Sequence, residues 1–221
     1  MSATAKRARR HIREDQLVTT TVRFSEWAQA HFNQVIVGIV ALVAIVAVLV
    51  FAANSRENSA RESERQMGSA MSLMLQGDYN AAKSSFQQIV DRSGGKQASK
   101  AYFFKAECEF KQGSFEDAMA DYDSYLANSA DYPEFEVAAL VGKALCLEGV
   151  RNYVEAAAAM ATAVDKMDPK DPRYGDAALS AGDLCAAARQ PREGLKYYQL
   201  ASEHGTGDVK ARATVAVELL E

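Results

Sequence analysis

The sequence predicts an all-α protein in which a single N-terminal transmembrane helix is followed by an α-solenoid of stacked helix pairs. Three observations lead to this prediction. Residues 35–53 form an uncharged apolar run, and after it small and large apolar residues recur at spacings of 36 and 38. Turn-forming residues separate the recurring segments where helix pairs should end. A fixed repeat of about this length is typical of helical repeat domains.

The apolar run at residues 35–53 has the length of a membrane span. As a helix its 19 residues extend about 28 Å, close to the thickness of the hydrocarbon core. A buried core helix would be shorter and would carry a polar face. A cleaved signal peptide has an apolar region of about 7–15 residues after a short basic lead, whereas 34 residues precede this run. We therefore predict an uncleaved anchor.

Charge is distributed unevenly along the chain. Residues 1–34 carry six basic and three acidic side chains, residues 35–53 carry none, and the remaining 168 residues carry 19 basic and 26 acidic ones. The basic excess before the span predicts that the N-terminus is cytoplasmic and that the body lies outside the cytoplasm. The acidic body argues against nucleic-acid binding, which needs a basic surface.

The segment before the span, residues 1–34, is predicted to be a basic cytoplasmic tail that ends in an amphipathic juxtamembrane helix. From Glu14 to Gln34 the residues Leu17, Phe24 and Trp27 share one helical face. Aromatic residues at this distance from a span are typical of the membrane interface. The segment either positions the chain beside the membrane or serves as a docking site.

The body, residues 54–221, contains about four repeats and a final capping helix. The small residues Ala82, Ala118, Ala156 and Gly194 recur at 36, 38 and 38, and a large apolar residue follows each after four positions. A second small register lies twelve residues upstream each time, at Ala70, Ala106, Ala144 and Gly182. The residues expected to pack the repeats are Gly77, Tyr79, Ala82, Phe86, Gly113, Phe115, Ala118, Tyr122, Tyr153, Ala156, Met160, Gly194 and Tyr198.

This pattern is what paired helices require. A small residue lets the partner helix come close, and a bulky residue one turn away fills the remaining gap. No single pair can bury its apolar face alone, so the pairs stack into a solenoid. Breakers fall between the expected pairs, at residues 93–95, 131–133 and 168–172. The last stretch, residues 208–219, would cap the stack.

The recurring pattern G-x-[YF]-x-x-A-x-x-x-[FYM] resembles the tetratricopeptide repeat over about residues 60–205. The chain has, in order, an E-D-Q-L-V start, the sequence H-F-N-Q before the span, a single span and a small repeat body. This layout of the whole chain resembles one family in particular, the YfgM-like family. Members of that family are ancillary subunits of the SecYEG translocon. The resemblance implies a bacterial inner-membrane protein with a periplasmic repeat domain, and Sec translocon subunits and periplasmic chaperones as partners.

No catalytic constellation is present in the sequence. It has no G-x-S-x-G, no H-E-x-x-H and no phosphate loop. The three cysteines include no C-x-x-C pair, and the three histidines are scattered. We therefore predict a protein that is not an enzyme and that uses no cofactor, no metal and no small-molecule substrate.

The cysteines follow the repeat, since Cys108, Cys146 and Cys185 are spaced by 38 and 39 residues. Cysteine can act as a small apolar residue at a packing position. The alternative is a redox-sensing or disulfide-forming role outside the cytoplasm. The small neighbouring residues favour the packing role.

The resemblance to tetratricopeptide repeats also implies a concave groove lined by the first helix of each pair. The positions that this register assigns to the groove are Met67, Met71, Met74, Phe103, Glu107, Phe110, Lys111, Val141 and Leu145. The lysine and asparagine clamp of the chaperone-docking subclass is absent. Methionine and phenylalanine suit an apolar, adaptable contact with a helix or an extended segment, although core packing can explain any one of them.

The sequence thus predicts a membrane-anchored scaffold for protein–protein interactions at the cell envelope, as an ancillary factor of the Sec translocon that links it to periplasmic chaperones. One alternative is an adaptor of another envelope complex, for secretion, division or outer-membrane assembly. A second alternative is a redox-responsive regulator that uses the cysteines.

Overall fold

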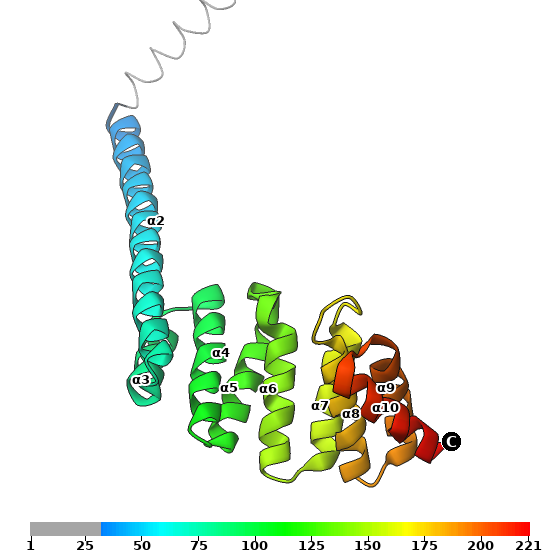
Figure 1. Cartoon of the computed structure of the whole chain (residues 1–221). Coiled ribbons are helices and arrows are strands. Elements are labelled where there is room, and N and C mark those ends of the chain that lie inside the picture. The colour runs from blue at the N-terminus through cyan, green and yellow to red at the C-terminus, as the bar shows by residue number, and fades with distance from the viewer. Residues whose placement is uncertain (1–31) are drawn as a thin grey trace, which may run out of the picture. The chain divides into compact units, whose positions relative to one another are not determined.

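The structure is a computed structural model that describes residues 32–221, except for the side chains of residues 32, 33, 35, 39, 52–60 and 131 (Figure 1). The described part is all-helical and contains no strand, as the sequence predicted. Its helices are α2 (Phe32–Leu75), α3 (Tyr79–Arg92), α4 (Gly95–Lys111), α5 (Phe115–Ala127), η1 (Ser129–Asp131), η2 (Pro133–Phe135), α6 (Glu136–Gly149), α7 (Tyr153–Lys166), α8 (Tyr174–Ala187), α9 (Pro191–His204) and α10 (Gly207–Leu220).

Helix α2 is 44 residues long and includes the apolar run. Within the described part of the chain, no helix offers a stretch that is both long enough and apolar enough to cross a membrane. The predicted span at 35–53 includes residues 35, 39, 52 and 53, whose side chains lie outside the described set. Of the predicted tail and juxtamembrane segment at residues 1–34, residues 1–31 lie outside the described residues, and residues 32–34 begin α2. The membrane span therefore stays a prediction.

Residues 1–58 and 59–221 are separate units, and the second holds the repeats. In that second unit each helix packs mainly against the helices before and after it in the chain. Figure 1 shows α4 to α9 following one another in chain order. The first pair consists of residues 59–75 of α2 with α3, since Met67 and Ala70 share one buried cluster with Phe86. The pairs α4–α5, α6–α7 and α8–α9 follow, and α10 packs against α9 and α8.

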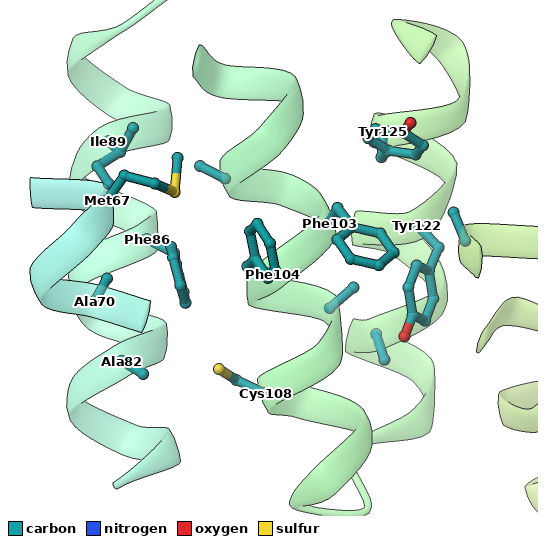
Figure 2. Packing of buried hydrophobic residues seen from close by; sticks show 14 of the residues in the cluster. Met67, Ala70, Ala82, Phe86, Ile89, Phe103, Phe104, Cys108, Tyr122 and Tyr125 are labelled. Carbon is teal, nitrogen blue, oxygen red and sulfur yellow. The ribbon is translucent and has the colours of Figure 1, made fainter. Parts of the chain in front are cut away.

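Small residues lie at the contacts between these helices. Ala70, Ala106 and Ala144 of the first helices are fully buried, as are Ala82 and Ala118 of the second helices. The large residues one turn further along are buried beside them, namely Phe86, Tyr122, Met160 and Tyr198. Figure 2 shows Phe86 of α3 and Phe104 of α4 facing each other, with Phe103 and Tyr122 on the other side of α4. The core therefore runs through the pairs rather than lying at one place.

Two tyrosines pack so closely on glycines that no side chain would fit there. A Cβ atom at Gly182 would lie 2.7 Å from the Tyr198 ring, and one at Gly142 would collide with the Tyr122 ring. The Tyr198 ring thus lies against the first helix of its own repeat, and the Tyr122 ring lies against the first helix of the next one. These contacts set the spacing of the helices.

The turn between the two helices of each repeat has the same geometry four times. Gly77, Gly113, Arg151 and Arg189 occupy this position with φ values of +82°, +76°, +60° and +61°. In each case the next residue donates its N–H to the carbonyl five residues earlier, for example Ser114 to Glu109 at 2.9 Å. This is the Schellman ending of a helix, which favours glycine at the left-handed position. Of the predicted packing residues, Gly77 and Gly113 are therefore exposed turn residues.

The turn geometry predicts opposite effects of exchanging glycine and arginine. The left-handed conformation costs a residue with a Cβ atom about 1–2 kcal/mol, a cost that glycine avoids. Glycine offsets part of this gain because its unfolded state is more flexible. We expect Arg151→Gly to raise the free energy of unfolding by about 0.5–1 kcal/mol, and Gly113→Arg to lower it by about 1 kcal/mol. Urea denaturation of the full chain measures both values. Arg151→Ala is the control, since it keeps the Cβ atom and should gain nothing.

Candidate protein-binding groove

A solvent-exposed groove of about 450 Å³ lies along α4, α6 and α8. Its apolar centre comes from α6 and α7, where Val141, Leu145 and Met160 meet. The turns of each helix place these side chains together, because Val141 and Leu145 are four residues apart and share one face of α6. Polar side chains surround this centre, namely Glu107, Lys111, Arg173, Asp176 and Ser180.

The structure brings five of the nine predicted groove residues together. They are Glu107, Phe110, Lys111, Val141 and Leu145. Met71 and Met74 are half-buried and pack against the core of the first two repeats, so they do not line this groove. The groove therefore lies over the second to fourth repeats, whereas the sequence placed it over the first three.

Met67 and Phe103 do not line the groove but belong to the core. Their exposed fractions are only 2% and 5%. The Phe103 ring stacks on Phe135 with a centroid distance of 4.5 Å and an interplanar angle of 5°, and it also contacts Tyr125. Phe135 comes from η2, the second of two short helices between α5 and α6. This connection therefore covers Phe103, the α4 residue that the repeat register had assigned to the open groove.

Several groove residues were missed because they flank a segment, residues 168–172, that was interpreted only as a breaker. Met167 directly follows α7, and Arg173 directly precedes α8. Asp176 and Ala177 lie in the first turn of α8. The sequence of residues 168–172 indicates a turn but not its path, so nothing in the local pattern shows that its ends reach the groove.

A tyrosine–carboxylate hydrogen bond borders the apolar centre. The Tyr122 hydroxyl donates to Glu107 Oε1 at 2.6 Å. Burial and the Glu107 charge raise the pKa of Tyr122, so the phenol remains neutral and continues to donate. Residue Glu107 is thereby held at the groove edge.

The same bond recurs two repeats later. The Tyr198 hydroxyl donates to Asp183 Oδ1 at 3.0 Å, and Arg212 of α10 binds Asp183 Oδ2 at 3.0 Å. The corresponding positions of the third repeat hold Leu145 and Met160 instead. An apolar pair therefore lies between two polar pairs, which accounts for the apolar centre of the groove.

The basic residues at the two ends of the groove differ in their partners. Arg173 forms a two-point ion pair with Asp171, at 3.0 and 2.7 Å, and hydrogen bonds from Arg173 lower the pKa of Asp171 to about 2. Lys111 is exposed, and its ammonium lies 5.8 Å from the centroid of the Phe110 ring. Within residues 32–221 no ion pair to Lys111 is formed. Of these two basic residues, Lys111 is therefore the one that remains available to a ligand.

The three cysteines are buried free thiols, on α4, α6 and α8. Burial, then the charges of Glu107 and Glu109, raises the pKa of Cys108 and of Cys146 to about 11. Burial also raises the pKa of Cys185. Buried thiols with raised pKa values form little thiolate and react slowly. These observations favour the packing role over the redox role.

Among the described residues, no three histidine, cysteine, aspartate or glutamate side chains lie close enough together to hold a metal ion. The groove is apolar at its centre, and its carboxylate Glu107 is already bound to a hydroxyl. What the arrangement offers is a surface that can bury apolar side chains of a ligand.

Residues 68–133 match the tetratricopeptide repeat family. The match covers the first two repeats of the structure and ends at the connection before α6. No curated protein sequence matches the chain.

Three solved structures have a similar fold over 64% to 75% of the chain. The crystal structure of MamA has a TM-score of 0.56 at 12% identity, covering 68% of this chain and 81% of MamA. The MamA RS-1 ArsTM double mutant has a TM-score of 0.54 at 17% identity, with coverages of 64% and 74%. The crystal structure of BtubC from P. vanneervenii has a TM-score of 0.56 at 15% identity, with coverages of 75% and 80%.

The repeat domain therefore has a fold similar to that of stacked tetratricopeptide repeats. Stacked tetratricopeptide repeats form extended concave surfaces, which such proteins use to bind partners. The likenesses are to the fold and identify no particular partner. They are consistent with a groove built from the first helices of successive pairs.

The burial of Phe103 and the partial exposure of Phe110 predict different costs of truncation. We expect Phe103→Ala to lower the free energy of unfolding by about 3–5 kcal/mol, because the cavity cannot be filled by its four aromatic neighbours. Phe110→Ala should cost less than about half of that. Urea denaturation of the full chain separates the two. A cost below about 1 kcal/mol for Phe103→Ala would place its ring outside the core.

Proposed function

We propose that this protein is a membrane-anchored adaptor whose repeat domain binds a segment of another protein in the groove. The observation that supports this most directly is the apolar centre of the groove, where Val141 and Leu145 are partly exposed beside the buried Met160 and Lys111 lies at the edge. An apolar ligand side chain that enters it gains about 25 cal/mol for each Å² removed from water. Binding rather than chemistry is therefore the proposed activity.

The membrane anchor is proposed from the apolar run at residues 35–53. In the described part of this run, the large apolar side chains are all exposed, with Val37 at 67% and Phe51 at 76%. A helix with apolar side chains on every face requires an apolar surrounding, which a lipid bilayer provides. The basic tail before the run supports a cytoplasmic N-terminus.

The proposed setting is the bacterial inner membrane, with the repeat domain in the periplasm next to the Sec translocon. The support for it is the layout of the chain, which resembles the YfgM-like family. Translocon subunits and periplasmic chaperones are then the proposed partners. An adaptor of a secretion, division or outer-membrane assembly complex would use the same groove with a different ligand. We propose no enzymatic activity, in keeping with the scaffold fold.

Position-specific crosslinking tests the groove. A photoreactive residue in place of Lys111 on the groove edge should form an adduct with a partner protein in living cells. The matched control replaces Val154, which is exposed on α7 and does not line the groove. Adducts with translocon subunits or chaperones at Lys111 alone would support the proposed setting, and adducts with another envelope complex would support the alternative. Equal labelling at both positions, or none at either, would contradict the groove as the binding site.

Reporter fusions test the membrane topology separately. A protein that fluoresces only in the cytoplasm should stay dark when it is fused after Glu221, because the body is predicted to lie outside the cytoplasm. The same reporter fused before Met1 is the control and should be bright. Fluorescence from both fusions would overturn the proposed localisation, and with it the translocon setting, while leaving the groove untouched.

A further inference from the structure

A buried charged cluster joins the two helices of the second repeat. Lys105 and Glu109 come from α4 and Asp121 comes from α5. Glu109 is 3% exposed and Asp121 is 7% exposed. None of the three lines the groove. Buried ionised groups are costly unless they are paired, so this cluster calls for a reason beyond packing.

The cluster contains two carboxylates but only one ammonium. Lys105 Nζ lies 2.7 Å from Asp121 Oδ2 and 3.8 Å from Glu109 Oε1. The lysine therefore pairs with Asp121, and Glu109 is the weakly compensated acid. Glu109 Oε2 and Asp121 Oδ2 are both buried and have no hydrogen-bond partner among the described residues, but Asp121 Oδ2 has the Lys105 ammonium 2.7 Å away, whereas Glu109 Oε2 has no such ion pair.

The other titratable groups around Glu109 do not neutralise the negative charge of its carboxylate. The Lys83 ammonium on α3 attracts the Glu109 carboxylate without forming a hydrogen bond to it, and the Asp121 carboxylate on α5 repels it. From α6 the Cys146 thiol interacts with the Glu109 charge, and burial keeps this thiol protonated. Its own helix adds Glu107, which the Tyr122 hydroxyl already binds. A proton on Glu109 would remove the excess negative charge and would let the two carboxyl groups share a hydrogen bond.

We propose that Glu109 is a proton-binding switch that holds α4 against α5 when it is protonated and loosens this contact when it is ionised. Burial, and then the neighbouring Asp121, raises the pKa of Glu109 to about 7. The ordinary value for glutamate is about 4.3. The folded state thus binds one more proton than the unfolded state between about pH 4.3 and pH 7.

The direction of the effect follows from this difference. A raised pKa in the folded state stabilises the domain fully below the unfolded value, and the stabilisation is lost as the pH rises through about 7. The contact between α4 and α5 should therefore be more stable in mild acid than in mild base. The Glu109 carbonyl also accepts the N–H groups of Gln112 and Ser114 at the turn. Phe110 and Lys111, which line the groove, directly follow Glu109 in α4. A weaker contact between α4 and α5 would therefore also change the positions of these groove residues.

Unfolding of the full chain in detergent micelles at pH 5 and pH 8 tests the proposal. Relative to the wild type, Glu109→Gln should become more stable at pH 8, and the ratio of the two unfolding constants should change at least about tenfold between the two pH values. Glu148→Gln is the matched control, because Glu148 is exposed at the end of α6. Its ratio to the wild type should change less than twofold. An unchanged ratio for Glu109→Gln would overturn the proposal.

A second measurement does not depend on any variant. In the full chain labelled with ¹³C at its carboxyl groups, the Glu109 signal should titrate with a midpoint near pH 7. A midpoint below about pH 5 would show that the folded state does not hold the proton, and would overturn the proposal irrespective of how the glutamine variant folds.

Discussion

Close contact between small residues of paired helices is the constraint on which the repeat domain depends. Ala82 and Ala118 have no exposed surface, and a side chain at Gly182 would collide with the Tyr198 ring. Where a small residue lies on one helix, a ring or a methionine one turn away fills the space beside it. Because interiors are close-packed, replacing either member leaves a cavity or a clash. The contact thus sets both the helix spacing and the curvature from which a groove can arise.

The groove results from this packing and from one difference between the repeats in the residues that pair across it. Two repeats place a tyrosine over a carboxylate, as Tyr122 does with Glu107, while the third repeat has Met160 and Leu145 at the same positions. The polar pairs use their own hydrogen bonds internally and offer little to a ligand. In the apolar pair Met160 is buried, and the partly exposed Leu145 leaves apolar surface that another protein could bury.

Irregular segments decide the remaining features of the surface. The two short helices between α5 and α6 place Phe135 on Phe103 and so extend the core to a position that would otherwise face the groove. The segment at residues 168–172 brings Arg173 to the other end of the groove. Both segments are longer than the turns within the repeats, and their paths follow from what they can bury rather than from any repeat pattern. The buried Glu109 adds a sensitivity to pH that the repeat pattern equally does not require.

The sequence by itself determined the helical fold, the number of pairs and the small-residue contacts. Each of these depends on local spacing, and the residues at 82, 118, 156 and 194 repeat that spacing along the chain. It also placed Val141 and Leu145 on a common face, since residues four apart on a helix share one. Only the tertiary structure decided that Phe103 and Met67 are core, and that Glu109 faces Asp121 within the same repeat. Those features depend on segments that meet across a turn or a connection, where the chain path is set by burial and charge pairing and not by periodicity.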